Sequence, residues 1–76
     1  MDAELKVNLD ALRAVWSMRY APTYDERMAY LAAEEACAVF AMAQTERERV
    51  RTFAAACDAI YAALHAIDAA QEGEES

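Results

Sequence analysis

The stretch RYAPTYDERMAY, residues 19–30, marks the point where one helix ends and the next begins. Pro22 is the only proline of the 76-residue chain, and a proline biases the residue before it, here Ala21, away from helical geometry. Thr23 and Glu26 follow with the spacing of a capping box, in which each side chain accepts a hydrogen bond from the other residue's backbone amide. We therefore expect the chain to turn here and a new helix to start at about residue 24.

The segment before this turn has the apolar spacing of a helix that packs on one side. Asp2 precedes the segment and is a favoured N-cap residue. The large apolar residues recur at intervals of four and three, which places them on one face: Leu5, Leu9, Leu12 and Trp16. The pattern predicts a first helix over residues 3–19.

The segment after the turn contains two further helices. The second is predicted over residues 24–43. Thr45 and Glu48 repeat the capping-box spacing and predict a third helix over residues 46–70, and Gly73 is a typical helix stop. The third helix has an apolar seam at alternating intervals of three and four: Val50, Phe53, Cys57, Ile60, Leu64 and Ile67.

The connection between the second and third helices is short, and this leaves an alternative open. Only Gln44 and Thr45 separate the two predicted helices, and both residues tolerate a helix. A single long helix that pairs with another copy of the chain is therefore an alternative to a turn.

The composition indicates an all-α protein with a single domain. The chain has one glycine, one proline and many alanines, and alanine has the highest helix propensity. We expect a small three-helix bundle over residues 1–71, followed by a frayed acidic tail over residues 72–76. A chain this short buries only about 60% of the surface that its unfolded form exposes, so dimerisation into a larger bundle also stays open.

The net charge disfavours two classes of partner and favours a third. Fourteen acidic residues against seven basic ones give a formal net charge of −7. Binding to nucleic acid or to an anionic membrane requires a basic footprint, so neither is expected. An acidic chain is attracted instead to a protein with a basic surface.

The N-terminal residues and the hydropathy favour a cytoplasmic protein. The first ten residues include early acids and no long apolar core, unlike a secretory signal, and no window of the chain approaches 18 apolar residues. In a cytoplasmic protein we expect Cys37 and Cys57 to be free thiols.

The second helix is apolar on two opposite faces, although a three-helix bundle covers only one broad face of each helix. One face is assigned to the core: Tyr24, Met28, Leu31, Val39 and Met42. The opposite face is then left uncovered: Tyr30, Ala33, Cys37, Phe40 and Ala41. Uncovered apolar surface of this kind is typical of an interface with another copy or with a partner.

Glu35 lies in the middle of the face assigned to the core. A buried carboxylate needs a partner or becomes neutral, and Arg13 or a tyrosine hydroxyl is a candidate partner. Two interpretations stay open. Either Glu35 lies at the mouth of the core and reaches water, or it forms a buried ion pair or a ligand contact.

The residues that most often carry catalysis or bind metals do not form a diagnostic pattern. His65 has Tyr61 and Asp68 near it on the same helix, but no serine is placed as its nucleophile. Cys37, Cys57 and His65 do not have the spacing of a zinc site. The sequence contains no glycine-rich phosphate loop. We therefore expect no catalytic, cofactor-binding or metal-binding residues, and no enzyme activity.

The partner-binding residues are predicted on and around the uncovered face of the second helix. Tyr30 is central to the prediction, because aromatic side chains anchor many protein interfaces. Acidic neighbours are expected to attract a basic partner. The predicted set is Tyr20, Asp25, Glu26, Tyr30, Glu34, Cys37 and Phe40.

These features predict a small acidic protein-binding module and, more narrowly, an inhibitor that occupies a basic, nucleic-acid-binding surface of its partner. In size, charge and helicity the chain is similar to small phage-encoded inhibitors, including some anti-CRISPR and DNA-mimic proteins. Two alternatives stay open. One is a structural or assembly protein that acts as a helical homo-oligomer. The other is a regulator that binds a small ligand between its helices through Trp16, Tyr20 and Glu35.

Overall fold

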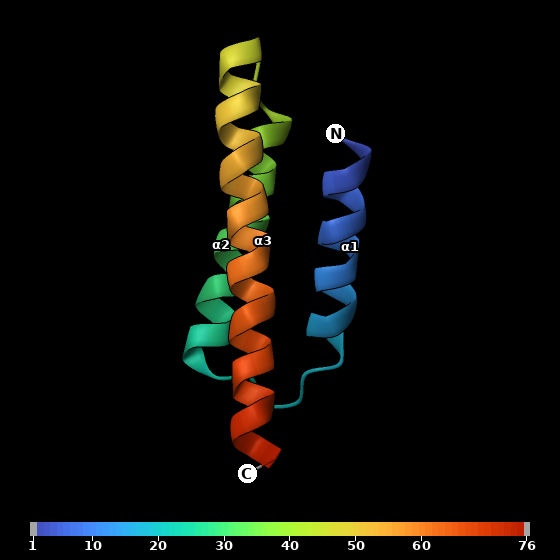
Figure 1. The fold of residues 1–76 in the computed structure, drawn as a ribbon, viewed down its shortest axis with the longest axis vertical. Helices are drawn as coiled ribbons and strands as arrows, with labels where there is room; N and C mark the ends of the chain where they lie inside the picture. The colour runs from blue at the N-terminus through green and yellow to red at the C-terminus, as the bar shows by residue number, and fades with distance from the viewer. Residues whose placement is uncertain (1, 76) are drawn as a thin grey trace.

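The computed structural model describes the backbone of residues 2–75 and the side chains of residues 2–73. These residues form helix α1 (Ala3–Ser17), helix α2 (Tyr24–Ala41) and helix α3 (Glu46–Glu75). The helices run down, up and down, so that α1 and α3 are parallel and α2 is antiparallel to both (Figure 1). This arrangement confirms the predicted all-α three-helix bundle. The alternative of one long helix is wrong, because the chain reverses between Ala41 and Glu46.

The caps of α1 and α2 form as their residue types predict. The Asp2 carboxylate accepts hydrogen bonds from the amides of Glu4 and Leu5, at 2.9 and 3.2 Å. The Thr23 hydroxyl accepts from the amide of Glu26 at 3.2 Å, and the Glu26 carboxylate accepts from the amide of Thr23 at 2.7 Å. The capping box therefore satisfies amides at the start of α2 that have no partner within the helix.

The start of α3 uses a variant of the same cap. The Thr45 hydroxyl accepts from the amide of Glu48 at 3.1 Å, as predicted. The Glu48 carboxylate, however, accepts from the amide of Gln44, one residue before the predicted donor, at 3.0 Å. Both bonds fix the turn between α2 and α3 and explain why the helix does not continue through it.

The ends of the helices differ from the predicted ones. Helices α1 and α2 each stop two residues early, at Ser17 and Ala41, whereas α3 continues five residues further, to Glu75. The predicted stop at Gly73 is wrong, because Gly73 lacks the positive φ that a C-terminal glycine cap uses. The rest of the predicted tail, namely the side chains of Glu74 and Glu75 and all of Ser76, lies outside the described residues.

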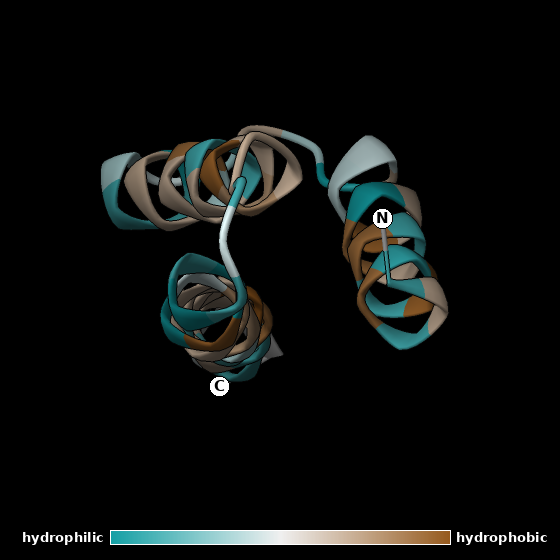
Figure 2. Cartoon of the chain, turned by 90° about the horizontal axis from the view of Figure 1, so that it is seen from above, coloured by the Kyte–Doolittle hydropathy of each residue, from teal (hydrophilic) through white to brown (hydrophobic). Residues whose placement is uncertain are grey.

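The core lies between the three helices and is built from two kinds of side chain. Helix α1 contributes leucines: Leu5, Leu9 and Leu12. Helices α2 and α3 meet largely through small residues and two isoleucines: Ala33, Cys37, Ala56, Ile60, Ala63 and Ile67. Small side chains let two helix backbones approach closely, so α2 and α3 lie against each other while α1 stands farther away (Figures 1 and 2).

The predicted seam of α3 is confirmed only in part. Ile60 and Ile67 are fully buried, but Val50 at the start of the seam is 64% exposed. Two alanines outside the seam, Ala56 and Ala63, are fully buried instead. The contact with α2 therefore turns α3 so that part of its alanine-rich side faces the core.

Candidate docking surface

The structure reverses the predicted orientation of α2. Ala33 and Cys37 are fully buried, and Tyr30 and Phe40 pack partly buried against them. The face predicted to be uncovered is therefore the core face, and this prediction is wrong. Both faces are apolar, so hydrophobicity did not distinguish them. The small residues occupy the inner face because it lies close to α3.

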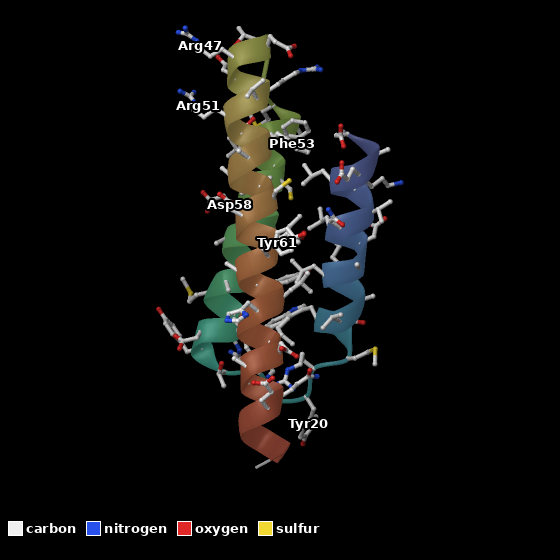
Figure 3. All side chains as sticks on the ribbon, in the orientation of Figure 1. Tyr20, Arg47, Arg51, Phe53, Asp58 and Tyr61 are labelled. Carbon is white, nitrogen blue, oxygen red and sulfur yellow. The ribbon has the colours of Figure 1, made fainter. Side chains whose placement is uncertain are left out.

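The predicted partner-binding residues consequently do not share one surface. Tyr20 is 91% exposed in the connection between α1 and α2, and Asp25 is exposed at the first turn of α2. Figure 3 shows Tyr20 near the lower end of the molecule, where it projects away from the helices. The other five residues are wholly or partly buried on the inner side of α2: Glu26, Tyr30, Glu34, Cys37 and Phe40.

Glu26 forms an ion pair inside the molecule. Its two carboxylate oxygens accept from the guanidinium of Arg19 at 2.7 and 3.2 Å, and both side chains are almost completely buried. The hydrogen bond from Arg19 holds the pKa of the Glu26 carboxyl below its ordinary value, although burial acts in the opposite direction. The ion pair thus links the connection between α1 and α2 to the first turn of α2. The charge of Glu26 is therefore not available to a partner.

Glu34 and Tyr30 connect α2 to α1. The guanidinium of Arg13 donates to the two carboxylate oxygens of Glu34 at 2.9 and 3.2 Å, and this contact raises the pKa of Arg13. The rings of Trp16 and Tyr30 stack with centroids 4.6 Å apart. These contacts fill the wider space between the two helices and fix the inner face of α2.

Both cysteines are free thiols in positions that make them weakly reactive. Cys37 is buried and Cys57 is partly buried. Burial raises the pKa of each thiol, so the reactive thiolate is less populated than at an exposed cysteine. We assign both residues to packing rather than to a contact with a partner.

The outer face of α2 carries a row of large apolar side chains, which we call the outer stripe. All five are between 47% and 78% exposed: Tyr24, Met28, Leu31, Val39 and Met42. They recur at helical spacing over 19 residues, so the stripe is about 27 Å long. Glu35 is exposed at the centre of the stripe, and the exposed alanines Ala32 and Ala38 border it on either side. The sequence prediction assigned this face to the core.

A signal for the outer stripe was present in the sequence. Glu35 lies within the stripe, and no basic residue of α2 lies one turn away from it. A carboxylate in that position is more easily solvated than buried. The carboxylate therefore indicated that this face is the outer one, although its apolar side chains were assigned to the core.

A second feature is an open groove at the end of the bundle where α2 leads into α3. Its volume is about 500 Å³, and its floor includes the edge-to-face pair Phe40 and Phe53, with ring centroids 5.7 Å apart. Figure 3 shows Phe53 near the upper end of α3. The rim combines the acids Asp2 and Glu46 with Arg49, so its charges select neither an anion nor a cation.

The other candidate sites have less support. The proposed small-ligand residues do not converge, because Trp16 stacks on the inner side of α2 whereas Glu35 lies on its outer face and Tyr20 in the connection. Among the described residues, no group of three His, Cys, Asp or Glu side chains has the geometry to hold a metal ion.

Helix α3 is long and apolar enough, between Glu46 and Gly73, to cross a membrane by length and composition alone. A mostly buried core helix of a water-soluble protein can meet the same condition, whereas 22% of the most apolar window of α3 is buried inside the bundle. In this structure α3 packs against α1 and α2 through Ile60 and Ile67.

Comparison with known proteins found no match. No family model, no curated protein and no solved structure matches the chain.

Proposed function

We propose that this protein is a protein-binding module and that the outer stripe of α2 is its contact surface. The observation that carries the proposal is the exposure of five large apolar side chains in one row along α2 and its C-cap, with Glu35 at the centre of the row. Contiguous exposed apolar surface is uncommon on a small soluble protein unless a partner covers it.

Burial of the outer stripe would favour association. Complete burial of a large apolar side chain stabilises by about 1.5–3 kcal/mol, so covering a half-exposed one contributes about 1 kcal/mol. Five such residues together contribute several kcal/mol. By contrast, the exposed apolar residues of α1 and α3 are more dispersed: Val7, Met18, Val50 and Tyr61.

Charge supports a basic partner. The net charge of −7 attracts a positive surface and accelerates encounter at low ionic strength. Glu26 and Glu34 already bind arginines within the molecule, so we assign the attraction to other acids, including Asp25 and Glu35. The narrower form of the proposal is an inhibitor that occupies a nucleic-acid-binding surface; it is supported only by the similarity of the chain in size, charge and helicity to small phage-encoded inhibitors.

A homo-oligomer is the second candidate function. The observation that favours it is the further exposure of two apolar residues, Val7 of α1 and its C-cap Met18, in addition to the outer stripe. Sedimentation velocity at micromolar concentration separates the candidates. A monomer contradicts the homo-oligomer, and a concentration-dependent dimer that Leu31→Asp abolishes supports it.

Affinity capture from a lysate of the source cells tests the protein-binding proposal. The tagged full chain is compared with Leu31→Asp in the outer stripe and with Ala62→Asp, which adds the same charge at an exposed position of α3. We expect a protein that wild type and Ala62→Asp retain at low salt and that Leu31→Asp loses. Equal retention by all three chains would contradict the proposal.

A further inference from the structure

We propose that the outer stripe receives an amphipathic helix of the partner, and that a basic residue within the apolar seam of that helix lies opposite Glu35. This inference rests on the proposed function. The inference goes beyond that function by naming the shape of the partner and the charge at one position of the contact.

The shape of the outer stripe fits a helix better than a broad surface. Together with Glu35, its residues follow one another at intervals of four and three, the spacing at which one helix presents a narrow seam to another. The stripe spans about 27 Å, which is the length of about 18 residues of a partner helix. Ala32 and Ala38 border the stripe, and side chains this small let a second helix approach closely.

Glu35 indicates which charge the partner needs at the position opposite it. Its side chain is exposed and forms no ion pair or hydrogen bond with the part of the chain that the structure describes. A helix that covers Leu31 and Val39 also removes water from Glu35, which lies one turn from each. A carboxylate that loses water is costly unless a charged donor replaces it. Arginine suits this position best, because its guanidinium donates two parallel hydrogen bonds to a carboxylate.

The outer stripe of a second copy does not supply that residue. The five residues of the outer stripe and Glu35 include no base, and two copies each carry a net charge of −7. Charge complementarity therefore favours a basic partner helix over self-association.

Labelled helical peptides test the inference with the full chain. One 18-residue peptide has an apolar seam with a central arginine, and a second has glutamine at that position. Fluorescence anisotropy measures the affinity of both for wild type, Glu35→Gln, Leu31→Asp and the control Asp58→Asn. Asp58 is an exposed acid on α3 that points away from α1 (Figure 3), so its substitution removes the same charge outside the stripe.

We expect wild type and Asp58→Asn to bind the arginine peptide roughly ten-fold more tightly than the glutamine peptide. Glu35→Gln should bind both peptides equally, and Leu31→Asp should bind neither. Arginine preference that persists in Glu35→Gln would overturn the inference, because it would come from the overall charge.

The failure of the inference and the failure of the proposed function give different results. If neither peptide binds wild type, but Leu31→Asp still loses the protein captured from lysate, the partner is not a helix and the protein-binding function stands. If capture does not depend on Leu31, the proposed function fails as well. A wild-type dimer that Leu31→Asp dissociates would show that a second copy is the occupant, and would also overturn the inference.

Discussion

The two faces of α2 differ in the side chains at their centres, and the face with small side chains at its centre is the buried one. The inner face centres on Ala33 and Cys37, which are fully buried. The outer face carries the large residues of the outer stripe, which are at least 47% exposed. Apolar content alone therefore does not identify the core face of a helix when both faces are apolar.

The difference follows from how closely α2 approaches α3. Ala56 and Ala63 of α3 are fully buried in the same core as Ala33 and Cys37, so small residues come from both helices. Placing the outer stripe at this contact would hold the two backbones farther apart and leave the small residues in water. The buried ion pair between Arg19 and Glu26 further fixes the rotation of α2, because Glu26 lies on the inner side.

Removing the charge of Glu26 should have the largest effect on the inner face. In Glu26→Gln the amide still caps the helix, but the buried Arg19 loses its ion pair with the Glu26 carboxylate, so the free energy of unfolding should fall by about 3 kcal/mol. Urea unfolding measures the change. The matched control is Asp25→Asn, an exposed neighbour that should change stability by less than about 0.5 kcal/mol. Equal effects of the two substitutions would contradict the buried pair.

A pair of adjacent alanines compares the two faces directly. Ala33→Leu places three extra carbons at the closed contact with α3 and should destabilise the protein by about 2 kcal/mol. Ala32→Leu places the same atoms on the exposed outer side and should change stability by less than about 0.5 kcal/mol. Urea unfolding of both variants measures the difference. A larger loss in Ala32→Leu than in Ala33→Leu would mean that α2 is rotated the other way.

Protonation of Glu26 at low pH should lower the free energy of unfolding by less than Glu26→Gln does. The loss in Glu26→Gln is the upper limit of this effect. Because Arg19 lowers the pKa of Glu26 in the folded state, the pair contributes stability above the ordinary pKa of 4.5 and loses it as the pH falls through the folded-state value. The stability difference between wild type and Glu26→Gln should therefore be constant near neutral pH and shrink below about pH 4.5. Thermal unfolding between pH 7 and pH 3 checks this. A difference that does not change with pH would contradict an ionised buried pair.

The smallest effect is expected in the turn that leads into α2. Ala21 has a φ of 55°, in the left-handed region that favours glycine. Ala21→Gly should raise the free energy of unfolding by about 0.5 kcal/mol, because relief of the strain exceeds the added flexibility of the unfolded chain. The control Ala62→Gly, inside α3, should lower it by about 1 kcal/mol. Loss of stability in both variants would contradict the strained turn.

Local signals in the sequence predicted the elements of this fold well. Thr23 and Glu26 specify the start of α2 through atoms only three residues apart, and Leu5, Leu9 and Leu12 identify the buried face of α1 because that helix has one dominant apolar face. The end of α3 was less predictable. Gly73 permits a stop but does not require one, and the helix continues through it.

The candidate site could not be predicted in the same way, because it depends on the rotation of α2. That rotation depends on packing between helices that are distant in sequence, such as Ala33 of α2 in one core with the buried alanines of α3. It also depends on the ion pair between Arg19 and Glu26. Neither contact has a local pattern. Glu35 was the one local indication, since a carboxylate in an apolar row favours the side that faces water.

The measurement that tests the central claim most directly is the stability of Leu31→Asp, determined together with its affinity for the arginine-centred peptide. The outer stripe is proposed to carry binding rather than folding. The free energy of unfolding should therefore stay within about 0.5 kcal/mol of wild type, while the affinity falls at least roughly ten-fold. A loss of more than about 2 kcal/mol in stability would place Leu31 in the core and contradict the claim. Unchanged stability together with unchanged affinity would also contradict the claim, because Leu31 would then contribute neither to folding nor to binding.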